Sequence, residues 1–274
     1  QLMHFLLQNK IYRGIKMKKN ILICCLFLFL SFFIFSQTKE DYELLKKCDT
    51  TTSFIDTDFS AEYTLVQDKP GQSKSVTEAI MYRRDKTSNY TILITSPKND
   101  KGKGYLQIES NVWFYDPVDR RFTFSSKRDK FQNTNANTSD FAPMEFSNNY
   151  KIVSALPKKL GAYDCVLFEL DAKVDDVVYP KVKVWVTKDD GLIRKKEDYS
   201  LSGQLLRTTA IPSYQLIGTR SIPVSMLIVD NLKGKKINDK MQYEKTQISI
   251  KNVSFSKQKD TVFTKAYFEM MSNR

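Results

Sequence analysis

The sequence contains a single histidine, His4, close to the start of the chain. Histidine is the base of Ser-His-Asp and Cys-His catalysis and a ligand in most catalytic zinc sites, so the rest of the chain cannot build them. A phosphate-binding loop is also missing, because Lys101-Gly-Lys-Gly104 has neither the spacing nor the Lys-Ser/Thr ending of that motif. We therefore expect a protein that is not an enzyme, with no catalytic residue, no metal and no cofactor.

Paired carboxylates, another common acid–base arrangement, stand at predicted turns. Asp175-Asp176 and Asp189-Asp190 are interpreted as turn residues rather than as a glycosidase or metal pair, because aspartate side chains bond their own backbone in turns. Glycine and proline are scarce, at 9 and 8 residues, while 41% of the chain is hydrophobic. This composition argues against bulk disorder and predicts a folded, core-forming protein.

The longest apolar run lies near the start of the chain. Lys18 and Lys19 follow Met17, residues 21–35 are almost wholly apolar, and Ser36 ends the run. This order is typical of a secretory signal peptide, so we expect residues 17–36 to be removed and residues 1–16 to be upstream sequence read from a wrong start. An uncleaved membrane anchor is the alternative, although a run of about 15 residues is short against the roughly 20 of a spanning helix.

Export would change the charge of the chain. Residues 1–36 carry five basic residues and no acidic one, so removing them lowers the formal net charge from +12 to +7. A basic exported protein suits anionic lipid headgroups or an acidic partner, although a generic lysine-rich surface is equally compatible. Arg120 and Arg121 lie next to Phe122 and Phe124, and basic residues near aromatic ones can bind single-stranded nucleic acid. We expect no nucleic-acid partner for an exported protein.

Cysteine is scarce as well, and Cys48 and Cys165 are the two that remain after cleavage. In an oxidising compartment they either form a disulfide or stay as buried free thiols.

Most of the chain reads as strands. After one predicted helix at residues 40–51, period-2 alternation begins with Phe59, Ala61, Tyr63 and Leu65 and recurs to residue 255, with turn signals every 10 to 20 residues. The aromatic segment 97–126 predicts a tightly turned antiparallel meander, since a parallel pair needs a long crossover. We expect one antiparallel sheet of about eleven strands, which must curl or close.

The chain from residue 37 onward resembles the outer-membrane lipoprotein-sorting proteins, the family of the periplasmic carrier LolA. The resemblance rests on the order and spacing of short motifs: Asp58-Phe-Ser-Ala-Glu62, Met81-Tyr-Arg-Arg84, Val112-Trp-Phe-Tyr-Asp-Pro117, Tyr179-Pro-Lys-Val-Lys-Val-Trp185 and Gly218-Thr-Arg-Ser-Ile-Pro223. Ser139-Asp140-Phe141 also matches. The family often has a glycine-containing segment before it, where this chain has Asn135-Ala-Asn-Thr138.

The resemblance implies a mainly β (α+β) fold, in which residues 37–274 form one domain. That domain would be a half-closed antiparallel β-barrel with a few helices covering its concave face. It implies a monomeric carrier that is located in the periplasm, either free or associated with the outer membrane. Such a carrier takes acyl chains of lipoproteins, or other lipids, from an inner-membrane donor to an outer-membrane acceptor. The alternative is a sensor, interaction or adhesion module on the same fold.

Candidate site residues follow from the apolar alternates of the early strands. We expect the lipid cavity to be lined by Phe59, Tyr63, Leu65, Ile80, Tyr82, Ile92, Ile94, Trp113 and Tyr115. For each of them, an ordinary core residue is the alternative interpretation. The family's carriers use an arginine of an early strand to hold the lid, and Arg83 and Arg84 both match that region.

Overall fold

The computed structural model describes residues 38–272. The expected signal peptide and the expected wrong start therefore lie outside the described residues. Among the helices that are described, none combines the length and apolar character needed to cross a membrane.

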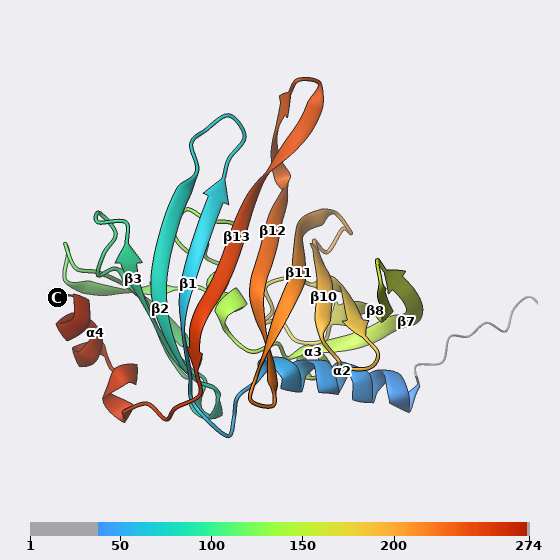
Figure 1. Ribbon diagram of the computed structural model, residues 1–274, viewed down its shortest axis with the longest axis horizontal. Coiled ribbons are helices and arrows are strands. Elements are labelled where there is room, and N and C mark those ends of the chain that lie inside the picture. The colour runs from blue at the N-terminus through green and yellow to red at the C-terminus, as the bar shows by residue number, and fades with distance from the viewer. Residues whose placement is uncertain (1–37, 273–274) are drawn as a thin grey trace, which may run out of the picture. The chain divides into compact units, whose positions relative to one another are not determined.

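Thirteen antiparallel strands form one sheet (Figure 1), in the order β6-β5-β4-β3-β2-β1-β13-β12-β11-β10-β9-β8-β7. Strands that follow one another in the chain are neighbours in the sheet, except for β6 and β7, and β1 pairs with β13. β6 and β7 form the two open edges, so the sheet is not closed into a barrel. The strands are β1 (Phe59–Asp68), β2 (Ser75–Arg84), β3 (Asn89–Ser96), β4 (Gly104–Ile108), β5 (Asn111–Asp116), β6 (Arg121–Ser125), β7 (Tyr150–Leu160), β8 (Tyr163–Ala172), β9 (Lys181–Thr187), β10 (Ile193–Tyr199), β11 (Leu205–Ile217), β12 (Arg220–Ile237) and β13 (Lys240–Ser254).

Helical pieces cover both faces of this sheet. The inner face is the one that contacts α2 (Lys39–Thr52), α3 (Phe146–Asn149) and residues 126–145, which we call the lid segment and which contains the 3₁₀ turn η2 (Thr138–Phe141). The outer face carries η3 (Asp260–Phe263) and α4 (Lys265–Ser272), and a further 3₁₀ turn, η1 (Asp85–Thr87), joins β2 to β3. The predicted half-closed antiparallel barrel is confirmed, with thirteen strands rather than about eleven.

Alternation along the strands assigns side chains to the two faces. In β1, Phe59, Ala61, Tyr63, Leu65 and Gln67 are buried while the residues between them are more exposed. Side chains of successive residues point to opposite faces of a strand, so these five share the inner face. The same alternation in β9 puts three buried valines on the inner face, and these are Val182, Val184 and Val186.

Helix α2 is started by a local capping motif, and its apolar side packs against the sheet. A capping box fixes its start, since Thr38 Oγ1 accepts from the Asp41 amide at 3.1 Å and the Asp41 carboxylate accepts from the Thr38 amide at 3.0 Å. Leu45 and Cys48, three residues apart, are fully buried against the inner face of β7–β11. α2 and α3 lie side by side there (Figure 1) and cover that half of the sheet.

The backbone of β3 and the helix α4 lie so close to one position of β4 that it must be glycine. A Cβ built on Gly104 would lie 1.9 Å from the carbonyl oxygen of Ile92 and 2.7 Å from the ring of Phe268. Phe268 itself is 1% exposed and packs against Leu106 and Tyr115. Both faces of β3–β5 are therefore buried, one by the lid segment and the other by α4.

Candidate functional site

An apolar surface lies between the lid segment and the inner face of the sheet. The lid segment contributes Phe131, Ala136 and Phe141, all buried, to a cluster whose other members come mostly from β1–β5, β12 and β13. The Phe141 ring lies edge-on to Tyr63 with centroids 5.6 Å apart, and Phe131 lies 5.1 Å from Tyr105 and 4.7 Å from Phe141. Five of the nine residues expected to line a cavity belong to this cluster, namely Phe59, Tyr63, Leu65, Ile92 and Ile94.

The other four expected residues lie on the opposite face of the sheet. Ile80 and Tyr82 line a small apolar crevice between β2, β3 and α4. Trp113 lies under the Lys265 ammonium, 3.7 Å from its ring centroid, and Tyr115 packs edge-on against Phe268 at 5.5 Å. The alternation predicts correctly which residues share a face of the sheet, but it does not say which face contacts the lid segment. Residues on both faces are apolar here, because α4 buries the outer face. None of these four borders the lid segment's apolar cluster.

The structure distinguishes the two candidate arginines. Arg83 points to the inner face and is 8% exposed. Its guanidinium donates to the Asp85 carboxylate at 2.6 and 2.7 Å, to the carbonyl of Thr52 at the end of α2 at 2.6 Å, and to the carbonyl of Phe141 in the lid segment at 3.3 Å. Arg83 thus joins the sheet, α2 and the lid segment at one point.

Arg84 points the other way and holds the C-terminal part of the chain. It bonds both oxygens of Asp58 at 2.8 Å, the Asp260 carboxylate at 2.6 Å and the Gln258 carbonyl at 2.7 Å. The hydrogen bonds from Arg84 lower the pKa of Asp58, and the bonds to Asp58 raise the pKa of Arg84 in turn. Arg84 is therefore a contact of the η3 region and not of the lid.

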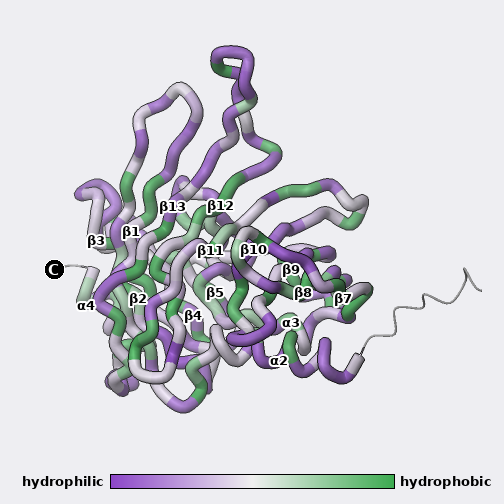
Figure 2. Tube along the Cα trace, turned by 45° about the vertical axis from the view of Figure 1, so that its right-hand side comes forward, coloured by the Kyte–Doolittle hydropathy of each residue, from purple (hydrophilic) through white to green (hydrophobic). Residues whose placement is uncertain are grey.

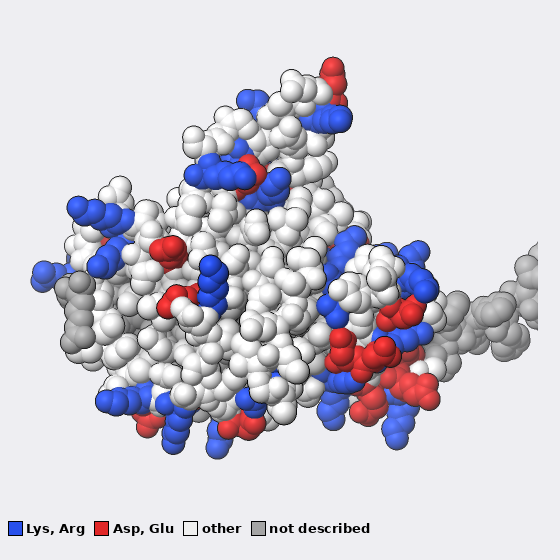
Figure 3. Space-filling model, viewed as in Figure 1, with Lys and Arg blue, Asp and Glu red and all other residues white. Residues whose placement is uncertain are grey.

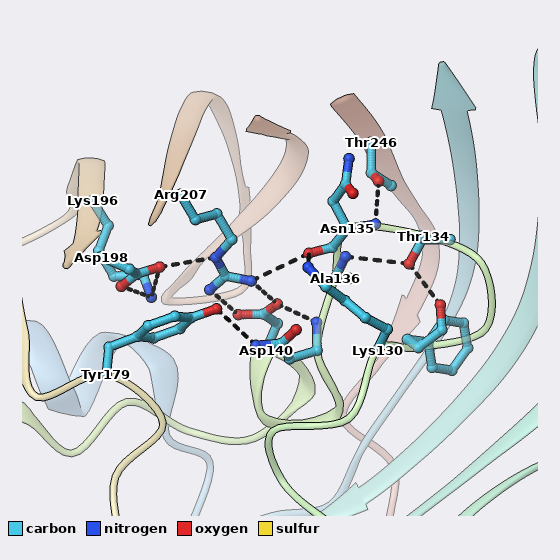
Figure 4. Close-up of polar contacts among 12 residues, drawn as sticks. Lys130, Thr134, Asn135, Ala136, Asp140, Tyr179, Lys196, Asp198, Arg207 and Thr246 are labelled. Atoms are coloured by element: carbon cyan, nitrogen blue, oxygen red, sulfur yellow. Dashed lines mark hydrogen bonds and ion pairs between the residues drawn. The ribbon is translucent and has the colours of Figure 1, made fainter. Parts of the chain in front are cut away.

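A second ionic contact, which the sequence did not reveal, holds the lid segment to β11 (Figure 4). Arg207 is 2% exposed, and its two terminal nitrogens donate to both oxygens of Asp140 in η2, at 2.6 and 2.8 Å. Its Nε donates to Asp198 of β10 at 2.9 Å, and Asp198 also accepts from Lys196 at 2.8 Å. Burial by itself raises the pKa of the Asp140 carboxyl, but the charge and hydrogen bonds of Arg207, the charge of Lys196 and the Asn137 amide together outweigh it, so the pKa lies below its ordinary value.

Polar residues of the sheet complete the contact with the lid segment. Thr246 of β13 accepts from the amide of Asn135 at 2.8 Å and bonds the side chain of Gln67 on β1. The hydroxyl of Tyr179 accepts from the Asn137 side chain at 2.8 Å. The lid segment is thus attached by a band of buried polar groups that separates its own apolar cluster from the one beneath α2.

The two cysteines lie on different faces. Cys48 belongs to the inner cluster beneath α2, together with Val166 and Phe168 of β8, so Cys165, which alternates with them, points to the outer face. Both are buried free thiols. This arrangement corresponds to the second of the two alternatives that the sequence left open.

Acid is expected to weaken the lid contact. The pKa of Asp140 is lower in the folded protein than the roughly 3.9 of an unfolded aspartate, so its contribution is complete above that value and is lost as the pH falls through the folded pKa. Denaturant titrations at pH 6 and pH 3 should show a smaller acid loss in Asp140→Asn than in the wild type. Equal losses would contradict the assignment, since Asp58 and Glu169, whose pKa values are also lowered, titrate identically in both proteins.

Comparison with known proteins supports this fold assignment. A protein-family model described as "-like: Uncharacterized protein" matches residues 86–270, and a search of curated proteins found no match. A LolA superfamily protein from Nitrosomonas europaea superposes with a TM-score of 0.69 at 21% identity, over 82% of this chain and 97% of the other.

Two further solved structures agree at a TM-score of 0.71, each over 83% of this chain and 97% of the other. One is an outer membrane lipoprotein-sorting protein domain from Vibrio parahaemolyticus, at 17% identity, and the other a DUF1329 family protein from Desulfovibrio piger, at 16%. The chain therefore belongs to the family of uncharacterized proteins that this model describes, and its fold is that of the LolA-like outer-membrane lipoprotein-sorting proteins.

Proposed function

We propose that this protein is an exported carrier that holds the acyl chains of lipoproteins, or of another lipid, between the inner face of its sheet and the lid segment. The observation that carries the proposal is the apolar cluster in which the lid segment supplies Phe131, Ala136 and Phe141. An acyl chain that displaces these side chains covers the same apolar inner face of the sheet with another apolar group. A long chain gains roughly 0.8 kcal/mol for each buried CH₂, which is enough for tight binding without any catalytic group.

Release follows from the same geometry. The polar contacts of Arg83 and Arg207 with the lid segment form only when the lid is closed. A lid that closes without cargo gains these contacts, and a lid that opens around an acyl chain loses them. An acceptor that binds the cargo more tightly therefore draws it out, because only a difference in affinity shifts the equilibrium. We propose the periplasm as the site of action and a membrane donor and acceptor as the partners.

The projecting β12–β13 hairpin supports contact with a membrane surface. Figure 2 shows that its tip is hydrophilic, and Figure 3 shows that it carries mainly basic side chains together with acidic ones. Four exposed lysines lie within eight residues, together with Leu232 and Met241, whose exposed fractions are 54% and 55%; the lysines are Lys233, Lys235, Lys236 and Lys240. Basic residues beside exposed apolar ones suit a surface of anionic lipid.

A fluorescent acyl probe tests the proposal. Phe141→Ala removes a lid ring from the inner face, so we expect it to raise affinity for the probe several-fold while lowering stability. Trp113→Ala is the matched control, since Trp113 lies on the outer face under Lys265 and its loss should weaken folding without changing affinity. A loss of probe affinity in Trp113→Ala alone would place the acyl site on the outer face instead.

The second candidate function is a non-catalytic interaction module. The filling of the inner face by the lid segment's own side chains favours it, because a filled barrel needs no ligand. It predicts that delipidated wild-type protein gains no thermal stability from acyl ligands, whereas a carrier is stabilised in proportion to ligand concentration.

A further inference from the structure

The contact between Arg207 and the lid segment resembles a ligand-binding site in which Asp140, a residue of the chain itself, takes the place of the ligand. Both terminal nitrogens of the Arg207 guanidinium face both oxygens of Asp140, at 2.6 and 2.8 Å (Figure 4). Paired donors at this spacing are the arrangement by which arginine recognises a carboxylate or a phosphate from any source. Asp140 comes from η2 in the lid segment, whereas Arg207 is fixed in the middle of a strand.

The sheet by itself cannot satisfy this arginine. The sheet carboxylate of Asp198 takes only the Nε of Arg207, at 2.9 Å, and is shared with Lys196. Asp230, the cross-strand neighbour of Arg207 on β12, accepts from the backbone amides of Leu232 and Lys233 instead. The terminal nitrogens bond Asp140 and the Asn135 carbonyl, and both of these belong to the lid segment. Opening the lid therefore removes the partners of both terminal nitrogens of Arg207, although Asp198 still accepts from its Nε, and another anion can take their place.

A row of mostly polar residues crosses the inner face beside Arg207. Gln67, Thr246, Ile228, Thr209 and Lys196 are successive cross-strand partners on β1, β13, β12, β11 and β10, so they form one row across the inner face. Within the described residues, Thr209 Oγ1, Gln67 Nε2 and Asn135 Nδ2 are buried without any hydrogen-bond partner. Buried polar atoms are nearly always satisfied, so three of them in this band indicate that a polar ligand group fits here.

The position of this band matches an amphiphile. It lies between the apolar cluster under the lid segment and the apolar cluster under α2. Arg207 therefore lies where an apolar surface borders a polar band, which is the arrangement that an amphiphile needs.

We propose that Arg207 is a head-group site: when the lid opens, the carboxylate or phosphate of an anionic amphiphile replaces Asp140 while the acyl chain lies on the apolar inner face. This inference rests on the proposed carrier function and narrows its cargo to lipids with an anionic head group. Asp140 then acts as an internal competitor that keeps the site neutral when no cargo is present.

Three probes of equal chain length test the inference on the purified protein: dodecanoate, dodecyl phosphate and neutral 1-dodecanol, each displacing a fluorescent acyl probe. Hydrogen bonds to a charged group change affinity by about 10- to 100-fold, so the wild type should bind at least one anionic probe about tenfold more tightly than the alcohol. Asp140→Asn removes the competitor and should widen that preference. Arg207→Met combined with Asp140→Leu removes both charges together, so that neither is left unpaired, and should abolish the preference for anionic probes over the alcohol.

Each outcome has one meaning. A preference for dodecanoate or for dodecyl phosphate that the double variant loses supports the site and identifies its head group. Equal affinity of the wild type for all three probes, or a preference that the double variant retains, overturns the head-group site and leaves the carrier function standing. Failure of every variant to bind any probe overturns the carrier function, and the head-group site with it. The thermal unfolding midpoint of each variant, measured without probe, confirms that the fold is retained.

Discussion

Replacing Arg83 with glutamine is expected to lower the free energy of unfolding by about 3–5 kcal/mol, because removing one partner of a buried ion pair leaves the other charge uncompensated. Arg83 and Asp85 have side-chain exposures of 9% and 2%, so water cannot compensate for the loss. The substitution also removes the donors to the carbonyls of Thr52 and Phe141. Chemical denaturation measures the total effect, and hydrogen exchange resolves its location.

Hydrogen exchange should separate Arg83 from its neighbour in sequence. In Arg83→Gln we expect faster exchange in the lid segment and at the end of α2. In Arg84→Gln the faster exchange should appear at residues 257–264, because Arg84 bonds Asp58, Gln258 and Asp260. If the lid segment exchanged equally fast in the two variants, Arg83 would have no special role in holding it.

Replacing Asp198 with asparagine is expected to have a similarly large effect, about 3–5 kcal/mol, and for the same reason. Asp198 has no exposed surface and is the one carboxylate that bonds both Lys196 and Arg207. Without its charge, two buried cations face each other across β10 and β11. We also expect the lid segment to loosen, because Arg207 would lose the partner that orients its guanidinium toward Asp140.

Glu169→Gln is the matched control for Asp198→Asn. Glu169 pairs with Lys183 on neighbouring strands, but both side chains are 37% exposed, and such pairs contribute only about 0–1 kcal/mol. Urea denaturation of the two variants should therefore differ by several-fold in the lost free energy of unfolding. Similar losses would show that the buried cluster is no more important for stability than a surface ion pair.

The sequence was sufficient for the fold because alternation is a local signal. The alternation that begins at Phe59 and recurs to residue 255 corresponds to strands of the structure, and the helix expected at residues 40–51 is α2 at Lys39–Thr52. The antiparallel meander predicted for residues 97–126 is confirmed as β4–β6. The expected strand number was two too low, and the open edges at β6 and β7 follow from the long segment between them.

The candidate site was predicted only in part, because its geometry depends on long-range contacts. Periodicity groups Ile80 with Tyr82 and Phe59 with Tyr63, but it does not say which group faces the lid. The eight-residue helix α4 decides this, and its sequence gave too short a pattern to be recognised. Buried charges are equally hard to foresee, since Arg207 and Asp140 are 67 residues apart and look like ordinary surface residues of a strand and a loop. Only the Ser139-Asp140-Phe141 motif gave a signal, and it did not reveal the partner.

The most direct test of the carrier proposal is mass spectrometry of an organic-solvent extract of the purified protein, prepared without detergent. We expect stoichiometric acylated lipid in the extract, with an anionic head group if Arg207 binds it. An empty extract, repeated after milder purification, would contradict the carrier proposal and favour an interaction module whose inner face is filled by Phe131 and Phe141.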